Sequence, residues 1–281
     1  MASAKKTNKK PGGRKSSSAR RTSPRKAMRD MPRWKHILIA VAISAGALFI
    51  SYHLFLKQMI FRFEECNGTK AYGVCFPKGY LVFGIDISHH QGSINWEKVT
   101  SSNSKDVPIS FVYMKATEGG NHKDKRFKKN WDAASEHGFM RGAYHYFTET
   151  SSGDAQAANF INNVKLETGD LPPVVDIEEE PKDATAFSTE LKKLILRLED
   201  HYGVKPIIYS YSKYIGRYLQ DSFFDDYKLW IAHYEVEEPK VSRGWTIWQY
   251  TDKGDIPGIN EDVDINIFNG SMPQLKELLI K

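Results

Sequence analysis

Short apolar runs alternate with amphipathic segments from residue 81 onward, and this rhythm predicts the fold. The runs have the length and the Val, Ile and aromatic content of buried strands. The segments between them carry apolar residues at helical spacing, most clearly at about 187–202. Helices are expected at 95–99, 124–137, 154–166, 187–202 and 213–219 and after Ser271. Strands are expected at 81–87, 109–116, 141–147, 171–178, 206–211, 227–234, 245–250 and 263–268.

The order of these elements predicts a barrel. Five strand-helix units come first, and three further strands follow with loops between them. Alternating strands and helices indicate a mostly parallel sheet, and eight such strands can close on themselves. We therefore predict an α/β fold, an irregular β/α barrel of five β/α units plus three strands over residues 81–281. An open doubly wound sheet is the alternative, but no Gly-rich dinucleotide or phosphate loop supports nucleotide binding.

A single apolar run precedes the barrel. Residues 37–56 contain no formal charge and have the length of a helix that crosses a bilayer. A cleaved signal peptide is the alternative, although its apolar region is usually shorter and ends in small residues such as Ala-x-Ala. No such site follows Ser51. We interpret 37–56 as an uncleaved transmembrane anchor.

The charge is divided unequally around this anchor. Residues 1–36 hold 13 of the 40 Lys and Arg but 1 of the 34 Asp and Glu, so the rest of the chain is acidic by 27 against 33. The basic segment is too poor in apolar groups to fold alone and is predicted to be a disordered cytoplasmic tail. The barrel then lies outside the cytoplasm, facing a periplasm or the cell surface. Its acidic balance argues against nucleic-acid binding, and a monomer is expected.

Two cysteines, Cys66 and Cys75, lie in the predicted extracytoplasmic stalk, residues 57–80. Thiols on that side of a membrane tend to oxidise, which favours a disulfide loop. A two-ligand metal site would need His or carboxylate partners that this stretch does not offer at zinc-like spacing. Two free thiols are the remaining alternative.

The segment from Leu171 to Glu178 is an apolar strand that ends in alternating carboxylates. In an extended strand, Asp176 and Glu178 project on the same side, roughly 6.6 Å apart along the backbone. Burial of acidic groups costs free energy unless they are paired or used, which makes this pair a site candidate. The alternative is an acidic strand-to-loop junction that Glu179 and Glu180 continue into solvent.

Catalytic groups of a β/α barrel lie at the carboxyl ends of its strands. The residues expected there combine acids with aromatic rings, a mixture that suits a sugar polymer because rings stack on sugar faces while carboxylates assist glycosidic cleavage. They are Asp86, Lys115, Glu118, Tyr144, Tyr146, Asp176, Glu178, Tyr209, His233, Tyr234, Trp248, Gln249, Tyr250, Asp264 and Asn266.

A hydrolytic metal centre is the competing chemistry. Asp86, His89, His90, His145 and Asp176 are its candidate ligands. However, no His-x-Glu or His-x-His pair occurs at a strand end, and no serine stands in a Gly-x-Ser-x-Gly context. We therefore expect a site of carboxylates without metal or cofactor.

Eight short motifs follow one another along the predicted barrel. They are GIDISHHQG at 84–92, FVYMKATEG at 111–119, RGAYHYF at 141–147, PVVDIE at 173–178, PIIYS at 206–210, WIAHY at 230–234, WQY at 248–250 and VDIN at 263–266. With these motifs in this order, the chain resembles glycoside hydrolase family 25, the Chalaropsis-type lysozymes, over residues 82–270. The resemblance implies the same barrel, and a muramidase that acts on peptidoglycan strands at the β-1,4 bond from N-acetylmuramic acid to N-acetylglucosamine.

The resemblance also implies roles for individual residues. Glu178 matches the general acid, and Asp176 matches the carboxylate that orients or stabilises the substrate 2-acetamido group in a retaining reaction. Asp86 is the third catalytic candidate. A wall-binding or scaffold protein without turnover is the alternative, but a pure binder gains little from holding several like charges together. The expected substrate-binding residues are Asp264, Tyr144, Tyr209, Trp248 and Glu118.

Overall fold

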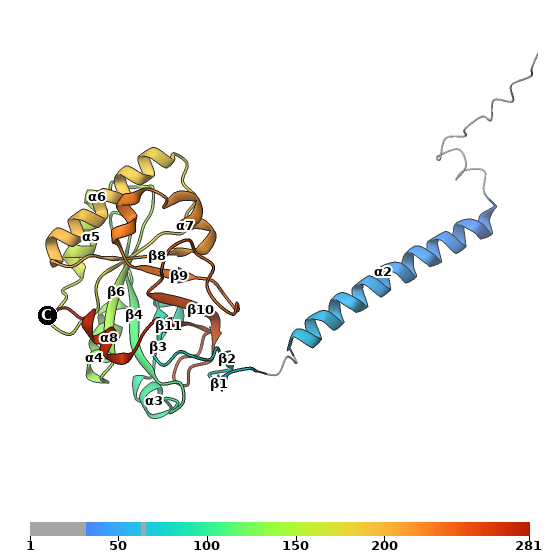
Figure 1. Ribbon diagram of the computed structural model, residues 1–281, viewed down its shortest axis with the longest axis horizontal. Helices are drawn as coiled ribbons and strands as arrows, with labels where there is room; N and C mark the ends of the chain where they lie inside the picture. Colours follow the sequence, from blue (N-terminus) through green and yellow to red (C-terminus); the bar gives the residue numbers. More distant parts are fainter. Residues whose placement is uncertain (1–31, 63–65) are drawn as a thin grey trace, which may run out of the picture. The chain divides into compact units, whose positions relative to one another are not determined.

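Eight strands close a barrel in the computed structural model of the protein, which describes residues 32–62 and 66–281, the side chains of 54–62 excepted (Figure 1). The closure is made by β3, which pairs with β4 on one side and with β11 on the other. A short strand, β5 (His122–Lys123), adds to the end of β4 outside the ring. The barrel strands are β3 (Phe83–Ile87), β4 (Ile109–Glu118), β6 (Met140–Tyr146), β7 (Val174–Asp176), β8 (Ile207–Tyr211), β9 (Leu229–Ala232), β10 (Ile247–Gly254) and β11 (Val263–Phe268).

The predicted division into five β/α units and three strands is confirmed. A helix follows each of the first five barrel strands, whereas β9, β10 and β11 are joined by loops. The strands from β3 to β10 run parallel, and β11 runs antiparallel to both of its neighbours. The helices are α3 (Trp96–Ser101), α4 (Phe127–Glu136), α5 (Gly153–Asn163), α6 (Ala184–Tyr202), α7 (Ser212–Tyr218) and α8 (Met272–Glu277), with 3₁₀ turns η1 (His89–Gln91) and η2 (Ser222–Asp226).

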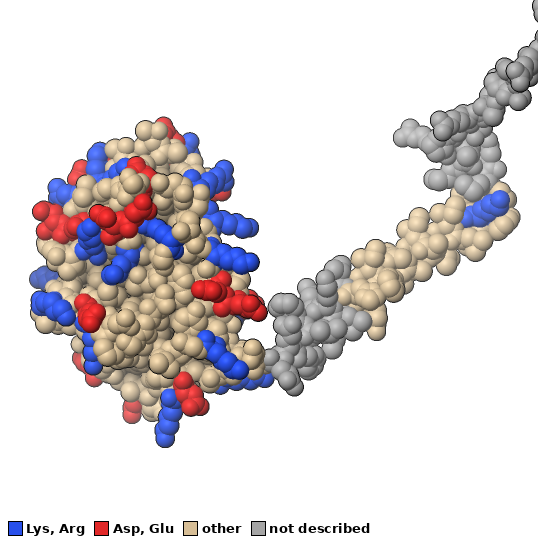
Figure 2. All heavy atoms as spheres, viewed as in Figure 1, with Lys and Arg blue, Asp and Glu red and all other residues tan. Residues whose placement is uncertain are grey.

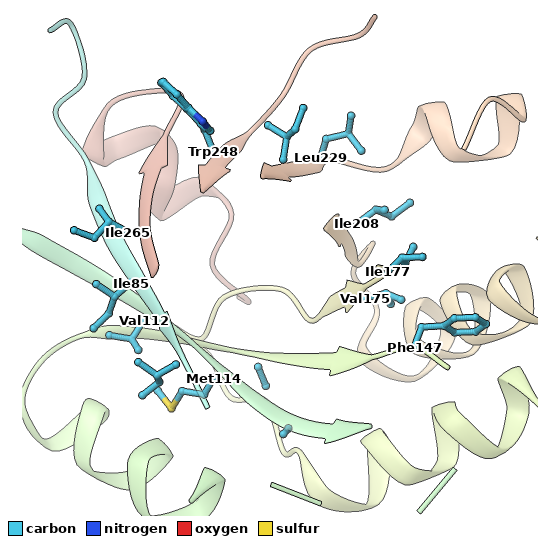
Figure 3. Packing of buried hydrophobic residues seen from close by; sticks show 14 of the residues in the cluster. Ile85, Val112, Met114, Phe147, Val175, Ile177, Ile208, Leu229, Trp248 and Ile265 are labelled. Atoms are coloured by element: carbon cyan, nitrogen blue, oxygen red, sulfur yellow. The ribbon is translucent and has the colours of Figure 1, made fainter. Parts of the chain in front are cut away.

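Side-chain alternation along the strands creates two cores. Val112, Val175 and Ile208 belong to the outer core, which fills the space between the sheet and the helices (Figure 3). Phe111 and Tyr113 belong to the inner core, which fills the barrel itself. Their rings require glycine on the flanking strands, because a Cβ at Gly84 or Gly142 would approach them to 2.4 or 2.2 Å.

The N-terminal compact unit contains the helix α2 (Arg33–Arg62). Arg33–His53 has a mean hydropathy of 1.7, and Figure 2 shows blue Lys or Arg atoms at one end of the described part of this helix and an uncharged surface along the rest. Its length and composition are those of a membrane anchor or of a signal sequence. The helix begins before the predicted segment 37–56. The disorder predicted for the tail concerns mainly residues 1–31, which lie outside the described residues.

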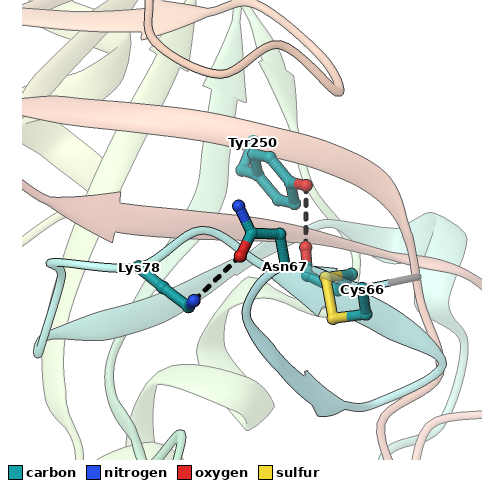
Figure 4. Close-up of a disulfide and its surroundings, with 5 residues drawn as sticks. Cys66, Asn67, Lys78 and Tyr250 are labelled. Carbon is teal, nitrogen blue, oxygen red and sulfur yellow. Dashed lines mark hydrogen bonds between the residues drawn. A yellow bond between two sulfur atoms is a disulfide. The ribbon is translucent and has the colours of Figure 1, made fainter. Parts of the chain in front are cut away.

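A disulfide-bonded hairpin opens the second compact unit, Cys66–Lys281. It consists of β1 (Thr69–Ala71) and β2 (Val74–Phe76), and the predicted Cys66–Cys75 bridge is present with a Cα–Cα distance of 5.6 Å. Phe76 is buried, its ring lies 5.0 Å from that of Phe83, and the Tyr250 hydroxyl donates to the Cys75 carbonyl at 2.7 Å (Figure 4). The hairpin is therefore part of the barrel unit, which starts before the expected residue 81.

Candidate active site

A cavity of about 300 Å³ lies at the carboxyl ends of the parallel strands. Five carboxylates line it: Asp86, Asp176, Glu178, Asp252 and Asp264. They come from β3, from β7 and the loop after it, and from β10 and β11. Because β11 runs antiparallel, its first residues lie at this end of the barrel, and Asp264 pairs in register with Asp86. Four of these acids, Asp86, Asp176, Glu178 and Asp264, were expected to converge, and the structure brings them together.

The short strand β7 directs two acids to the cavity. Val175 and Ile177 face the outer core, whereas Val174 and Asp176 line the cavity. Glu178 continues the same alternation beyond the end of the strand and also lines the cavity. The expectation that Asp176 and Glu178 share one side is therefore confirmed.

Burial is the main influence on the pKa values of Asp176 and Glu178. Asp176 is 7% exposed, and its Oδ1 has no hydrogen-bond partner among the described residues. Burial first, and then the charge of Glu178, raises the pKa of Asp176 well above its usual value. Burial also raises the pKa of Glu178, while hydrogen bonding from Tyr211 acts against this rise. Desolvation, rather than the charge of neighbouring carboxylates, is the larger cause for both acids, and it favours their protonated forms.

Asp86 and Asp264 are also shifted towards their neutral forms. Burial raises the pKa of Asp86 to about 7, although the amides of Asn266 and Gln249 donate to its Oδ2 at 2.7 and 2.9 Å. Burial, followed by the charge of Asp86, raises the pKa of Asp264 to about 9. The site thus holds protons that ordinary aspartates would have lost at neutral pH.

Within the described part of the chain, Lys115 is the one lysine or arginine at this cavity. Its Nζ lies 2.7 Å from Glu118 Oε2 and 4.5 Å from the centre of the Tyr146 ring. Glu118, an expected substrate-binding residue, does not line the cavity. The register shift between Lys115 and Thr117 pairs Glu118 with the cavity-lining Tyr146, so Glu118 lies on the same side of the sheet as Lys115 but beyond the cavity wall.

The aromatic wall differs from the expected one at Trp248. Tyr144 and Tyr209 line the cavity as expected, but Trp248 is fully buried in the outer core, with its ring 5.9 Å from that of Tyr80. Strand alternation explains this, because β10 can direct only every second side chain inward, and here that residue is Gln249.

Tyr211, Trp230 and Asp252 are among the lining residues that sequence reasoning missed, together with Ser88 and Val174. For the first, the signal was available, since Tyr211 lies two residues after Tyr209 on the same strand and so on the same face. Trp230 was assigned to a strand but not to its inner face. Asp252 follows a register shift in β10 that the sequence does not reveal.

The residues considered for a metal centre are not grouped as a ligand set, although Asp86, His90 and Asp176 all line the cavity. His145 faces away from the cavity, where its ring nitrogens lie 2.7 Å from Thr117 Oγ1 and 3.1 Å from Gln156 Oε1. Burial lowers its pKa to about 4. His89 Nδ1 lies 2.8 Å from Asp124 Oδ2 at the side of the site. Among residues 32–62 and 66–281, no three His, Cys, Asp or Glu side chains are grouped to hold a metal ion.

A closed β/α barrel with buried carboxylates and tyrosines at the carboxyl ends of its strands defines a class of glycosidase-like proteins. Comparison with known families gives a more specific result. The sequence model of the glycosyl hydrolases family 25 matches residues 85–259, and the chain belongs to this family.

Relatives with solved structures or curated sequences agree with this assignment. Lysozyme M1 of Streptomyces globisporus is 38% identical over 213 residues, covering 70% of this chain and 71% of the relative. The uncharacterized protein YegX of Escherichia coli is 36% identical over 230 residues, covering 81% and 84%. A family 25 glycosyl hydrolase from Bacillus anthracis superposes with a TM-score of 0.67 at 32% identity, covering 75% of this chain and 99% of that one. A lysozyme from Streptomyces coelicolor gives a TM-score of 0.64 at 37% identity, covering 70% and 96%.

Proposed function

We propose that the protein is a membrane-anchored lysozyme that hydrolyses the β-1,4 bond between N-acetylmuramic acid and N-acetylglucosamine in peptidoglycan. The observation that carries the proposal is the placement of Asp176 and Glu178 on one side of a cavity that Asp86 and Asp264 also line. Family membership supports the same reaction. Two tyrosines at this cavity, Tyr211 and Tyr234, are 38% and 37% exposed and offer ring faces to sugars.

Glu178 is the general acid of the proposed reaction. It is less buried than Asp176, so it can reach the glycosidic oxygen, and its raised pKa keeps a proton available for the leaving group. The bond from the anomeric carbon to this oxygen breaks as the proton is transferred. Glu178, now a carboxylate, then takes a proton from the water that completes the hydrolysis.

Asp176 assists at the anomeric carbon. Its unpartnered Oδ1 is a free acceptor for the N–H of the substrate acetamide. This hydrogen bond favours the ionised form of Asp176 and orients the acetamide oxygen for attack on the anomeric carbon. An enzyme carboxylate as nucleophile is the other route, and both routes retain configuration.

The direct test is hydrolysis by the full-length protein in detergent micelles. Dye-labelled peptidoglycan should be solubilised, and borohydride reduction of the products should convert N-acetylmuramic acid at the new reducing ends. NMR of the first-formed anomer should show retention. New N-acetylglucosamine ends would contradict the bond assignment. Binding to peptidoglycan without release of dye would support the alternative, a catalytically inactive wall-binding protein.

The proposed topology has its own test. A cytoplasmic basic tail and an extracytoplasmic barrel follow from the charge before the apolar helix. Protease added to intact cells or spheroplasts should digest the barrel and spare the tail. A mature protein that begins after residue 56, detected by mass spectrometry, would establish a cleaved signal instead.

A further inference from the structure

Gln249 of β10 connects a candidate catalytic acid to two tyrosines. Its side chain is 3% exposed, and both ends of the amide are used. The Nε2 group donates to Asp86 Oδ2 at 2.9 Å. The Oε1 atom accepts from the hydroxyls of Tyr209 at 2.8 Å and Tyr234 at 2.9 Å. All four residues line the cavity.

A second amide binds the same carboxylate oxygen. Asn266 Nδ2 donates to Asp86 Oδ2 at 2.7 Å, and Asn266 Oδ1 accepts from Trp230 Nε1 at 2.8 Å. An indole N–H can only donate, so it fixes which end of Asn266 faces Asp86. Asp86 Oδ2 therefore receives two N–H donors, which stabilise a carboxylate in a place where burial opposes charge.

The tyrosine hydroxyls are fixed by the same argument. A phenol has one proton, and the hydrogen-bond geometry directs those of Tyr209 and Tyr234 at Gln249 Oε1. Glu178, whose pKa is lowered by hydrogen bonding from Tyr209, is the competing acceptor for the Tyr209 proton. With its proton on Gln249, each oxygen has only lone pairs left for other partners. A glycan in the cavity would meet these two oxygens as acceptors for its hydroxyl or acetamide N–H groups.

We propose that Gln249 is a positioning residue, which sets Asp86 as a hydrogen-bond acceptor and the hydroxyls of Tyr209 and Tyr234 as acceptors toward the glycan. This inference rests on the proposed lysozyme function. It predicts that activity depends on the donor at Nε2 as well as on the shape of the side chain. An isosteric change that makes the donor depend on pH while it keeps the shape of the side chain separates the two contributions.

The variant Gln249→Glu provides this change. When protonated, the new side chain donates to Asp86 as the amide does. When ionised, it opposes Asp86 with like charge and has no donor. We expect kcat/KM close to the wild-type value near pH 5 and at least about tenfold below it near pH 8, because a lost charge-assisted hydrogen bond costs this much or more. Gln249→Met, which lacks both functions, should be impaired at both pH values.

The matched control is Gln156→Glu. Gln156 is also buried and hydrogen-bonded, to His145 and Thr148, but it lies on α5 and does not line the cavity. This variant should lose stability at high pH while its activity per folded molecule follows the wild-type pH profile. Thermal unfolding at each pH measures the folded fraction. Should Gln249→Glu fail to fold, Asn266→Asp removes the other donor to Asp86 and should show the same pH-dependent loss.

The possible outcomes distinguish a failure of the proposed lysozyme function from a failure of the positioning role of Gln249. If the wild-type protein is active, two results would overturn the positioning role alone. One is a pair of parallel pH profiles for wild type and Gln249→Glu, and the other is an equal loss of activity for the Glu and Met variants at both pH values. A wild-type protein that releases no dye would overturn the proposed function and this inference together. A loss for Gln249→Glu confined to high pH, absent in Gln156→Glu, supports the role.

Discussion

Buried carboxylates at the two ends of the barrel differ in their hydrogen-bond partners. At the amino end of β6, the Asp170 carboxylate accepts from Arg141 Nε at 2.7 Å and from the Glu167 backbone N–H at 2.8 Å. The Arg141 guanidinium also lies 4.3 Å from the centre of the Trp131 ring. At the carboxyl end, Asp176 is equally buried but its Oδ1 has no partner in the described structure.

This difference separates stability from function. Breaking a buried ion pair leaves an uncompensated charge and is strongly destabilising, whereas a buried acid without a partner has no such pair to lose. Four acids at the cavity, Asp86, Asp176, Glu178 and Asp264, have raised pKa values, mainly through burial. The fold retains this unfavourable arrangement at the end where barrel enzymes bind substrates. The paired Asp170 at the amino end of the barrel serves the structure, and the unpaired acids at the carboxyl end are available for chemistry.

The largest effect is expected at the unpaired end. Glu178→Gln should reduce turnover on polymeric peptidoglycan by ~10³-fold or more, because the leaving group loses its proton donor. The unfolding temperature should stay near that of wild type, since no buried ion pair is broken. Asp176→Asn should also be severely impaired while it still binds glycan. Dye release and peptidoglycan pull-down measure both variants, and near-normal turnover in Glu178→Gln would refute its role as the acid.

Substitution at the amino end of the barrel, where Asp170 is paired with Arg141, should reduce stability and not activity. Asp170→Ala leaves the buried Arg141 guanidinium without its main partner and should cost about 3–5 kcal/mol of stability. Activity per folded molecule should be retained. Glu167→Gln is the control, because that carboxylate is 74% exposed and its contact with Arg141 should be worth less than ~1 kcal/mol. Urea unfolding followed by tryptophan fluorescence measures both, and equal losses for the two variants would invalidate the distinction.

The disulfide should matter less. Cys66→Ser opens a loop of about ten residues, which chain entropy values at ~2 to 3 kcal/mol at most. The packing of Phe76 and the bond from Tyr250 do not involve the sulfur atoms, so the hairpin should remain on the barrel. Dye release should hardly change. Free thiols that titrate in the unreduced, correctly localised protein would contradict the bridge.

Periodicity was sufficient to predict the barrel and most of its elements. The apolar runs located all eight strands, and the absence of amphipathic segments after Tyr227 correctly indicated loops between the last three. The acids of the site were also found, because carboxylates at the ends of apolar strands are conspicuous. Asp86, Asp176, Glu178 and Asp264 lie together as expected.

The errors arose where the register of a strand decides the outcome. Trp248 and Gln249 are neighbours, and only the face of β10 determines which one enters the cavity. Glu118 lies beside Lys115 but beyond the cavity wall, and a register shift in β10 places Asp252 on that wall. The docking of the hairpin at Phe76 depends on tertiary contacts with Phe83 and Tyr250, so the stalk could not be distinguished from the barrel by pattern alone.

The smallest expected effect concerns the pH dependence of stability at the unpaired end. The pKa of Asp264 is about 9 in the folded state, whereas an unfolded aspartate titrates near 4. Between these values the folded state binds the extra proton, so the free energy of unfolding decreases as the pH rises from about 4 to about 9. The stability that protonated Asp264 contributes is fully present below pH ~4. It is lost as the pH rises through the pKa of Asp264 in the folded state.

Asp264→Asn removes this titration and should flatten the decrease. Relative to wild type, the variant should gain roughly 1–2 kcal/mol between pH 5 and pH 9, because solvent at the half-buried site reduces the full effect of the shift. Asp262→Asn, on an exposed residue just before β11, serves as the control and should leave the slope unchanged. Urea unfolding at pH 5, 7 and 9 measures all three proteins. Parallel curves for wild type and Asp264→Asn would show that the carboxylate is not held neutral by burial, and the contrast between the two ends of the barrel would then rest on hydrogen bonding alone.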